Sequence, residues 1–144
     1  ARIRNVSLEH QFCQPSTGHL SGGLLKLRKI ATGLNRYKKQ NGFMDFTDML
    51  EEFIKRKSSP KFKLLIIDEA QDLSSLQWDM VDILIKNSKE VYIAGDDDQA
   101  IFKWAGADPW RFKNQKGNRI ILDQSYRVPR AVQHKALNVI NRIH

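Results

Sequence analysis

Two short apolar runs separated by an amphipathic segment dominate the middle of the chain. Residues 64–67 and 91–94 are wholly apolar, and acidic residues follow each run. Short apolar runs that end at turn residues are typical of strands buried on both faces of a parallel sheet. Residues 73–87, between the runs, carry apolar side chains at helical spacing. The pattern therefore predicts an α/β fold built on a strand–helix–strand unit.

The carboxyl ends of the two predicted strands are where we expect ligand chemistry. In a right-handed strand–helix–strand unit both strands end at the same edge of the sheet. Open α/β sheets bind their ligands at that edge. Asp68 and Glu69 follow the first strand, and Asp96, Asp97 and Asp98 follow the second. The sequence therefore predicts that two acidic clusters meet at one site.

Further apolar patterns flank this unit. They predict helices over residues 20–37, 43–57 and 109–112 and after Pro129, and a third parallel strand over residues 119–122. In the second of these helices Asp45 or Thr47 can serve as the N-cap. The first helix has a basic face, which is either a solvated surface or a nucleic-acid contact.

Composition narrows the class of protein. The chain has 144 residues, of which 41% are hydrophobic and 28% charged, the values of an ordinary soluble domain. No apolar run approaches the roughly 20 residues that span a bilayer, and no signal-peptide pattern opens the chain. The single cysteine, Cys13, excludes an internal disulfide and is expected in the core. We therefore expect no membrane partner.

The net charge of +8 is unevenly distributed. Residues 1–43 carry +7, residues 44–110 carry −6 and residues 111–144 carry +7. An acidic centre between basic ends indicates a metal-binding site beside surfaces that suit a polyanion.

The residues at the predicted edge have the chemistry of phosphate hydrolysis. An acidic pair after an apolar strand, such as Asp68 and Glu69, is the arrangement of a Walker B motif. The first carboxylate holds Mg²⁺ and the second can act as a base for the attacking water. Gln99, after the next strand, can contact a γ-phosphate or orient that water.

Aromatic and cationic side chains suggest a nucleic-acid surface beside this site. Phe102 and Trp104 flank Lys103, and aromatic rings beside a cation form stacking platforms for single strands. Taken alone, a tryptophan such as Trp104 is more often a core residue than a stacking platform. Tyr126 offers a ring to a nucleobase, and Arg127 offers a guanidinium to a transferring phosphate.

These motifs together resemble those of the UvrD/Rep-type superfamily 1 DNA helicases. Residues 68–72 (DEAQD), 95–107 (GDDDQAIFKWAGA) and 122–127 (LDQSYR) resemble motifs II, III and IV in order and spacing. Residues 43–50 resemble the segment that precedes motif II in that family, so the resemblance covers residues 43–144. It implies a partial RecA-like motor domain that uses ATP and Mg²⁺ and acts on single-stranded and duplex DNA, 3′ to 5′. The resemblance leaves open whether the protein acts in DNA repair or in DNA replication. It would lie in the cytoplasm, or wherever the DNA of its host lies, and the protein could come from a phage.

The resemblance also implies roles for single residues. At the nucleotide site, Asp68 would bind Mg²⁺, Glu69 would be the general base and Gln99 would contact the γ-phosphate. Tyr126 would pack on adenine, and Arg127 would be the arginine finger. On the DNA side, Trp104 and Phe102 would stack on bases beside Lys103. Gln71 and Asp72 would join the hydrogen-bond network of the site. Phe102 stands where the family usually has Tyr, so a hydroxyl contact is lost while stacking is kept. Ser125 and Val128 stand where Asn and Ser are usual, so the residues that would support the arginine finger differ from those of the family.

One motif of the family has no counterpart in these residues. A P-loop requires G-x-x-x-x-G-K-[ST], which residues 1–144 do not contain. We therefore expect an internal piece of a motor, with residues 1–42 as a basic helical segment, 43–123 in the first motor domain and 124–144 entering the second. The remainder of the motor would be its partner, and this chain by itself would be inactive.

Two other functions are open at this point. The first is a module that binds DNA or a partner on the same fold without hydrolysing ATP. The second is a two-metal nuclease that uses Asp68, Glu69, Asp72 and residues 96–98 as ligands. The nuclease would leave Gln99, Trp104 and Arg127 unexplained.

Overall fold

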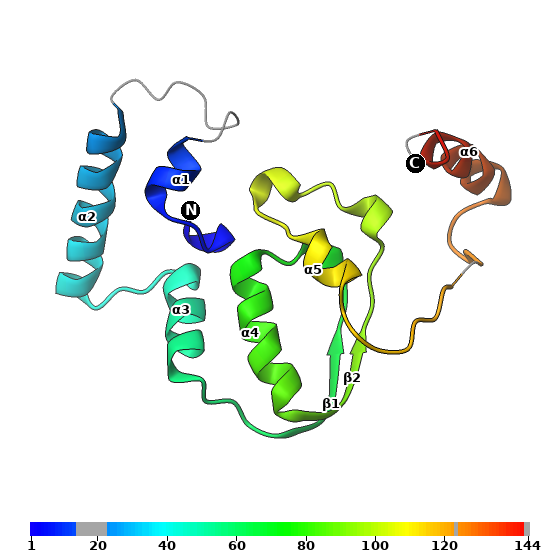
Figure 1. Ribbon diagram of the computed structural model, residues 1–144, viewed down its shortest axis with the longest axis horizontal. Coiled ribbons are helices and arrows are strands. Elements are labelled where there is room, and N and C mark those ends of the chain that lie inside the picture. The colour runs from blue at the N-terminus through cyan, green and yellow to red at the C-terminus, as the bar shows by residue number, and fades with distance from the viewer. Residues whose placement is uncertain (14–22, 123, 143–144) are drawn as a thin grey trace. The chain divides into compact units, whose positions relative to one another are not determined.

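The computed structural model describes residues 1–13, 23–122 and 124–142. The chain forms two units, residues 1–113 and 114–144, and each is described by itself (Figure 1). The helices of the first unit are α1 (Leu8–Phe12), α2 (Gly23–Asn41), α3 (Phe46–Arg56), α4 (Ser75–Lys86) and α5 (Pro109–Lys113), with short 3-10 turns η1 (Arg2–Arg4), η3 (Ala70–Asp72), η4 (Asp97–Gln99) and η5 (Lys103–Ala105). Its strands are β1 (Phe62–Ile67) and β2 (Ser88–Ile93), and the second unit contains α6 (Arg130–Ile140). None of the described helices is both long and apolar enough to cross a membrane.

The strand–helix–strand prediction is confirmed. β1 and β2 pair in parallel, with Leu65 opposite Val91 and Ile67 opposite Ile93, and α4 connects them (Figure 1). Ser74 caps α4 through a reciprocal pair of hydrogen bonds with Gln77, which explains why this helix begins where it does. Both strands consequently end at the same edge.

The core lies between α4 and one face of this sheet. Trp78 and Val81 of α4 are buried together with Ala70 of η3, and Ile67 and Ile93 of the strands pack against them. Burial of a large aromatic side chain such as Trp78 removes the most apolar area from water. This packing fixes the strand ends relative to α4.

The prediction that both faces of the strands are buried is wrong for this chain. The side chains of Leu64, Ile66 and Tyr92 point away from α4 and are 48%, 66% and 62% exposed. Alternate residues of a strand face opposite sides, and the described helices cover one side only. The prediction that Cys13 lies in the core is also wrong, because it is exposed.

The predicted third strand over residues 119–122 is absent from the part of the chain that the structure describes. Ile120, Ile121 and Leu122 have no regular secondary structure and are 85–90% exposed. A strand forms only when its N–H and C=O groups bond to a neighbouring strand, and no described residue pairs with these three. The helix predicted after Pro129 is confirmed as α6.

A group of ion pairs joins the end of α2 to the start of α3. The Lys38 Nζ lies 2.6 Å from Asp48 Oδ2 and 2.9 Å from Asp45 Oδ2, and Lys38 is buried. Arg2 pairs with both aspartates and with Glu51. Asp45 and Asp48 also form a reciprocal capping box at the start of α3, so Asp45 and not Thr47 is the cap.

This group predicts a specific sensitivity to acid. Hydrogen bonds from Lys38 hold the pKa of Asp48 and of Asp45 below the ordinary value of 3.8. A carboxylate with a lowered pKa in the folded state stabilises the fold above its unfolded pKa, and the effect is lost as the pH falls through the folded pKa. We therefore expect the free energy of unfolding to fall below about pH 5, and Asp48→Asn to flatten that decline.

Urea unfolding measured at a series of pH values checks this expectation. Glu52→Gln is the matched control, because Glu52 forms an exposed pair with Arg56, one turn along α3. An Asp48→Asn protein whose stability declines in acid as steeply as that of the parent would contradict the assignment.

Candidate functional site

Two carboxylates lie where β1 ends. Asp68 and Glu69 are both exposed, and Asp68 Oδ1 accepts a hydrogen bond from the backbone N–H of Glu69 at 2.9 Å. Glu69 has φ +51° and ψ +40°, a left-handed conformation that costs a non-glycine residue about 1–3 kcal/mol. This turn changes the direction of the backbone sharply after the strand. The two neighbouring carboxylates therefore do not simply point to opposite faces of the sheet, as they would along a strand.

The side chain of Gln71 links the ends of the two strands. It is 1% exposed; its Nε2 donates to Glu69 Oε2 at 2.7 Å, and its Oε1 accepts from the backbone N–H of Asp96 at 3.0 Å. The amide thus donates to the segment after β1 and accepts from the segment after β2. The structure confirms that the segments after both strands meet, and it identifies Gln71 as the connection. Asp72, its neighbour, instead has a buried Oδ1 without a hydrogen-bond partner among the described residues.

Gly95 makes this close approach possible. A Cβ at this position would lie 2.5 Å from Gln71 Oε1 and 3.2 Å from the backbone nitrogen of Ala70. The first distance is far inside van der Waals contact, so a larger residue would push Gln71 away from Asp96. The backbone of Ala70 also donates to the carbonyl oxygen of Ala94 at 3.0 Å, which extends the strand pairing into the site.

The loop after β2 is organised by Asp96. Its carboxylate accepts from the backbone N–H of Asp98 at 3.1 Å and from Gln99 Nε2 at 2.6 Å. Gln99 is therefore held at the strand edge by the residue that also bonds to Gln71. On the other side of the loop Asp97 forms an ion pair with Lys113 of α5, and the pairing raises the pKa of Lys113.

The aromatic residues follow at η5, with Phe102 as its N-cap and Trp104 within it. The rings of Phe102 and Trp104 lie 6.5 Å apart at 52°, and Trp104 is 77% exposed against 42% for Phe102. Trp104 is thus not a core residue of this unit. The segment beyond η5 is anchored, because Asp108 donates its backbone N–H to the carbonyl oxygen of Leu73 at 2.8 Å and accepts from Ser75 Oγ at 3.0 Å.

The donor set at the strand edge fits magnesium only together with phosphate and water. Mg²⁺ keeps several waters and needs one or two carboxylates beside the phosphates it binds. Asp68 provides one exposed carboxylate at the end of β1. Among the described residues, no three His, Cys, Asp or Glu side chains are grouped to hold a metal. This arrangement gives no support to the two-metal nuclease.

Tyr126 and Arg127 belong to the second unit. Tyr126 is 90% exposed and Arg127 is also exposed. The backbone around them is turned by a hydrogen bond from the N–H of Val128 to Ser125 Oγ at 3.1 Å. The structure relates these residues to each other and not to Asp68 or Gln99, because the two units are described separately.

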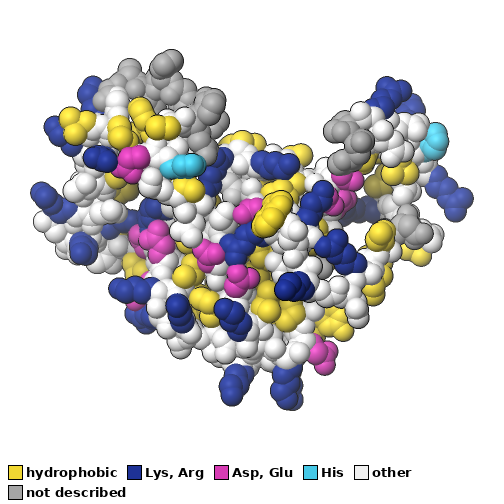
Figure 2. Space-filling view, viewed as in Figure 1, with side chains coloured by type: hydrophobic (Ala, Val, Ile, Leu, Met, Phe, Trp, Pro, Cys, Tyr) yellow, Lys and Arg dark blue, Asp and Glu magenta, His cyan; other side chains and the backbone are white. Residues whose placement is uncertain are grey.

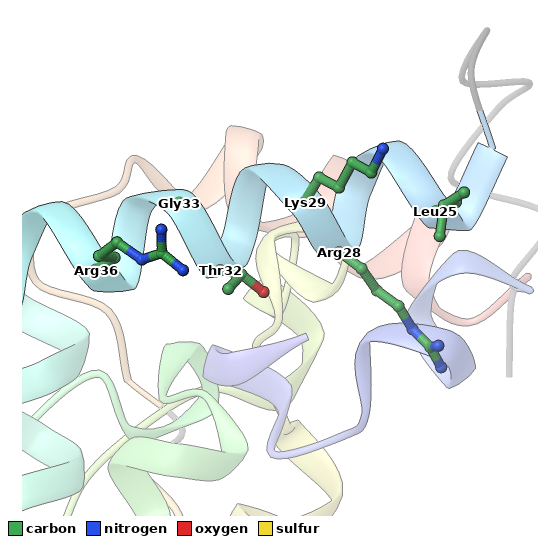
Figure 3. Close-up of a pocket in the computed structure, with 6 residues that line it drawn as sticks. All are labelled: Leu25, Arg28, Lys29, Thr32, Gly33 and Arg36. Atoms are coloured by element: carbon green, nitrogen blue, oxygen red, sulfur yellow. The ribbon is translucent and has the colours of Figure 1, made fainter.

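The helix α2 confirms the predicted amphipathic pattern but exposes much of its apolar face. Of that face, Ile30, Leu34 and Tyr37 are each more than half exposed, Leu24 and Leu27 are half-buried, and Leu20 lies outside the described residues. Dark blue side chains lie along the region of this helix in Figure 2. A shallow hollow of about 300 Å³ runs along it, lined by Leu25, Arg28, Lys29, Thr32, Gly33 and Arg36 (Figure 3). Arg28 in this set is paired with Glu9 of α1.

Comparison with known proteins gives one family and several relatives. The family model of the UvrD/REP helicase N-terminal domain matches residues 8–119. The chain is 28% identical to a probable DNA helicase II homolog of Mycoplasma pneumoniae, with 74% of this chain and 17% of that protein covered. It is 28% identical to the ATP-dependent DNA helicase PcrA of Staphylococcus aureus (77% and 17% covered) and to the ATP-dependent DNA helicase Rep of Buchnera aphidicola (65% and 16%). The chain therefore spans about a sixth of the length of these relatives.

Proposed function

We propose a function from the premise that this chain belongs to the UvrD/REP helicase family, whose N-terminal domain model matches residues 8–119. The chain forms part of the motor of an ATP-dependent DNA helicase, in which ATP hydrolysis drives movement on single-stranded DNA and unwinding of duplex DNA, 3′ to 5′. Residues 43–123 belong to a RecA-like first motor domain, 124–144 begin the second, and 1–42 form a basic helical segment. The relatives named as ATP-dependent DNA helicases support this proposal.

Residues of the strand edge, and Tyr126 and Arg127 of the second unit, each have a role in this proposal. Asp68 holds Mg²⁺, which when bound neutralises phosphate charge. Glu69 accepts a proton from the attacking water, and Gln99 contacts the γ-phosphate. Tyr126 stacks on adenine and Arg127 stabilises the charge of the transferring phosphate.

The DNA side of the proposal depends on the exposed aromatic turn. Trp104 and Phe102 stack on successive bases, and Lys103 contributes positive charge beside them. The basic residues of α2, such as Lys29 and Arg36, add a surface for the phosphate backbone.

The contact that carries the proposal is the bridge made by Gln71. It joins Glu69, the proposed base, to Asp96, which in turn holds Gln99. Five residues beyond Gln99 the same segment reaches Trp104. A change in nucleotide state at Glu69 therefore has a hydrogen-bonded route to Gln99, and from there the backbone leads on to Trp104.

A titration with a fluorescently labelled single strand, at low and moderate salt and with and without Mg²⁺–ATP, tests this function. We expect binding to this chain to weaken with salt, as phosphate contacts require, and to be unaffected by ATP, because residues 1–144 contain no P-loop. That result would equally fit a DNA-binding module that hydrolyses nothing, so ATP turnover in a polypeptide that supplies a P-loop separates the two functions. A chain that binds no DNA at either salt concentration would contradict the DNA-binding role.

A further inference from the structure

The amino-terminal segment contacts the aromatic turn from far away in the sequence. The Nη2 of Arg4 donates to the carbonyl oxygens of both Lys103 and Trp104, at 3.0 and 2.8 Å. These two oxygens belong to η5, whose carbonyl groups carry partial negative charge at this end of the turn. A guanidinium placed there satisfies both acceptors at once, and hydrogen bonds from a charged donor are stronger than neutral ones.

Packing around Gly106 keeps this segment in place. Gly106 is buried with φ +111°, and a Cβ at this position would lie 3.1 Å from Ile3 Cγ2 and 3.3 Å from Arg4 Cγ. The turn therefore ends directly against η1. On the other side of η1, Asn5 Nδ2 donates to Asp79 Oδ2 of α4 at 2.8 Å, and η1 packs on α4.

We infer that Arg4 is a positioning residue for DNA binding, which fixes the backbone that carries Trp104. This inference rests on the proposed stacking of Trp104 on DNA. Trp104 is 77% exposed, so few contacts of its own ring hold it. Its orientation is set by the backbone of η5, and Arg4 bonds to that backbone at the tryptophan itself. Without Arg4 the turn has more conformations available, and each DNA-binding event must select the productive one.

The test is a double-mutant cycle on single-stranded DNA affinity, measured by anisotropy of a labelled oligonucleotide. Arg4→Met removes both hydrogen bonds to η5 and is expected to weaken binding by about 3- to 10-fold, on the order of the net contribution of one hydrogen bond. In a Trp104→Ala protein the same substitution is expected to change affinity very little, because the residue it positions is gone. Arg4→Lys should restore most of the affinity, since a single nitrogen makes both bonds.

A charge-matched control distinguishes positioning of the turn from a general loss of positive charge. Arg56→Met removes one positive charge from an exposed pair elsewhere and should leave binding within about 2-fold of the parent. Equal losses from Arg4→Met with and without Trp104 would mean that Arg4 contacts DNA directly, and would overturn the positioning role. A loss that Arg4→Lys does not restore would overturn it as well.

Two further outcomes keep the test decisive. If Trp104→Ala leaves DNA affinity unchanged, the proposed stacking is wrong. If Trp104→Ala lowers the affinity and Arg4→Met does not, only the role of Arg4 is removed.

If Arg4→Met does not fold, Arg4→Gln takes its place. Its shorter neutral donor is expected to give a smaller loss of affinity that again vanishes in the Trp104→Ala protein. An undiminished loss in that protein would contradict the inference.

Discussion

Glu69→Gln is expected to lower the kcat of ATP hydrolysis by about 10²- to 10⁴-fold when the chain is part of a polypeptide that supplies a P-loop. Glutamine has the shape of glutamate but cannot accept the proton of the attacking water. Its side-chain oxygen can still accept the hydrogen bond from Gln71 Nε2, so the connection to Asp96 is expected to persist. ATP affinity should therefore change much less than turnover.

Steady-state hydrolysis and equilibrium nucleotide binding, measured on the same preparations, check this expectation. Glu52→Gln is the matched control, since it removes a carboxylate of α3 that pairs with Arg56 on the surface of that helix. Undiminished hydrolysis in Glu69→Gln would remove this residue from the role of base. A loss of nucleotide binding in parallel with turnover would instead indicate that the substitution disrupts the strand edge.

The elements that sequence patterns predicted well are those that local interactions determine. The apolar runs of β1 and β2, the helical spacing of α4 and the capping position of Asp45 all depend on residues within a few positions of one another. Such signals can be read from one short window. They also placed Glu69 and Asp96 at the same edge, because the handedness of the crossover determines where both strands end.

The predictions that failed required a distant partner. Residues 119–122 have the composition of a strand, but a strand also needs a neighbour, and no short window shows whether one is there. The prediction that Ile66 and Tyr92 are buried failed for the same reason, since burial depends on what packs against that face of the sheet.

The connections within the site were equally invisible in short windows. Gln71 reaches Asp96 across 25 positions, and Arg4 reaches Trp104 across 100. The glycine at position 95 was a usable signal in retrospect, since a glycine directly after a strand often marks a close approach to another group. For Arg4 the sequence offers no comparable signal, because it belongs to no motif.

Trp104→Ala is expected to weaken single-stranded DNA binding by about 1–3 kcal/mol, the value of one base stacked on an aromatic ring. The side chain is 77% exposed, so its removal should leave the free energy of unfolding nearly unchanged. This combination distinguishes a stacking surface from a core residue, for which affinity and stability would fall together. Equilibrium DNA titrations and urea unfolding of the same variant provide the two measurements.

Trp110→Ala is the matched control, because Trp110 is 70% exposed and lies on α5 in the same segment of the chain. Its loss should leave DNA affinity within about 2-fold of the parent, as expected for surface positions outside a contact. If both variants lose affinity equally, binding involves the wider surface from η5 to α5, and stacking is not specific to Trp104. If neither does, the exposed turn is not the DNA contact, and the basic face of α2 becomes the surface to test next.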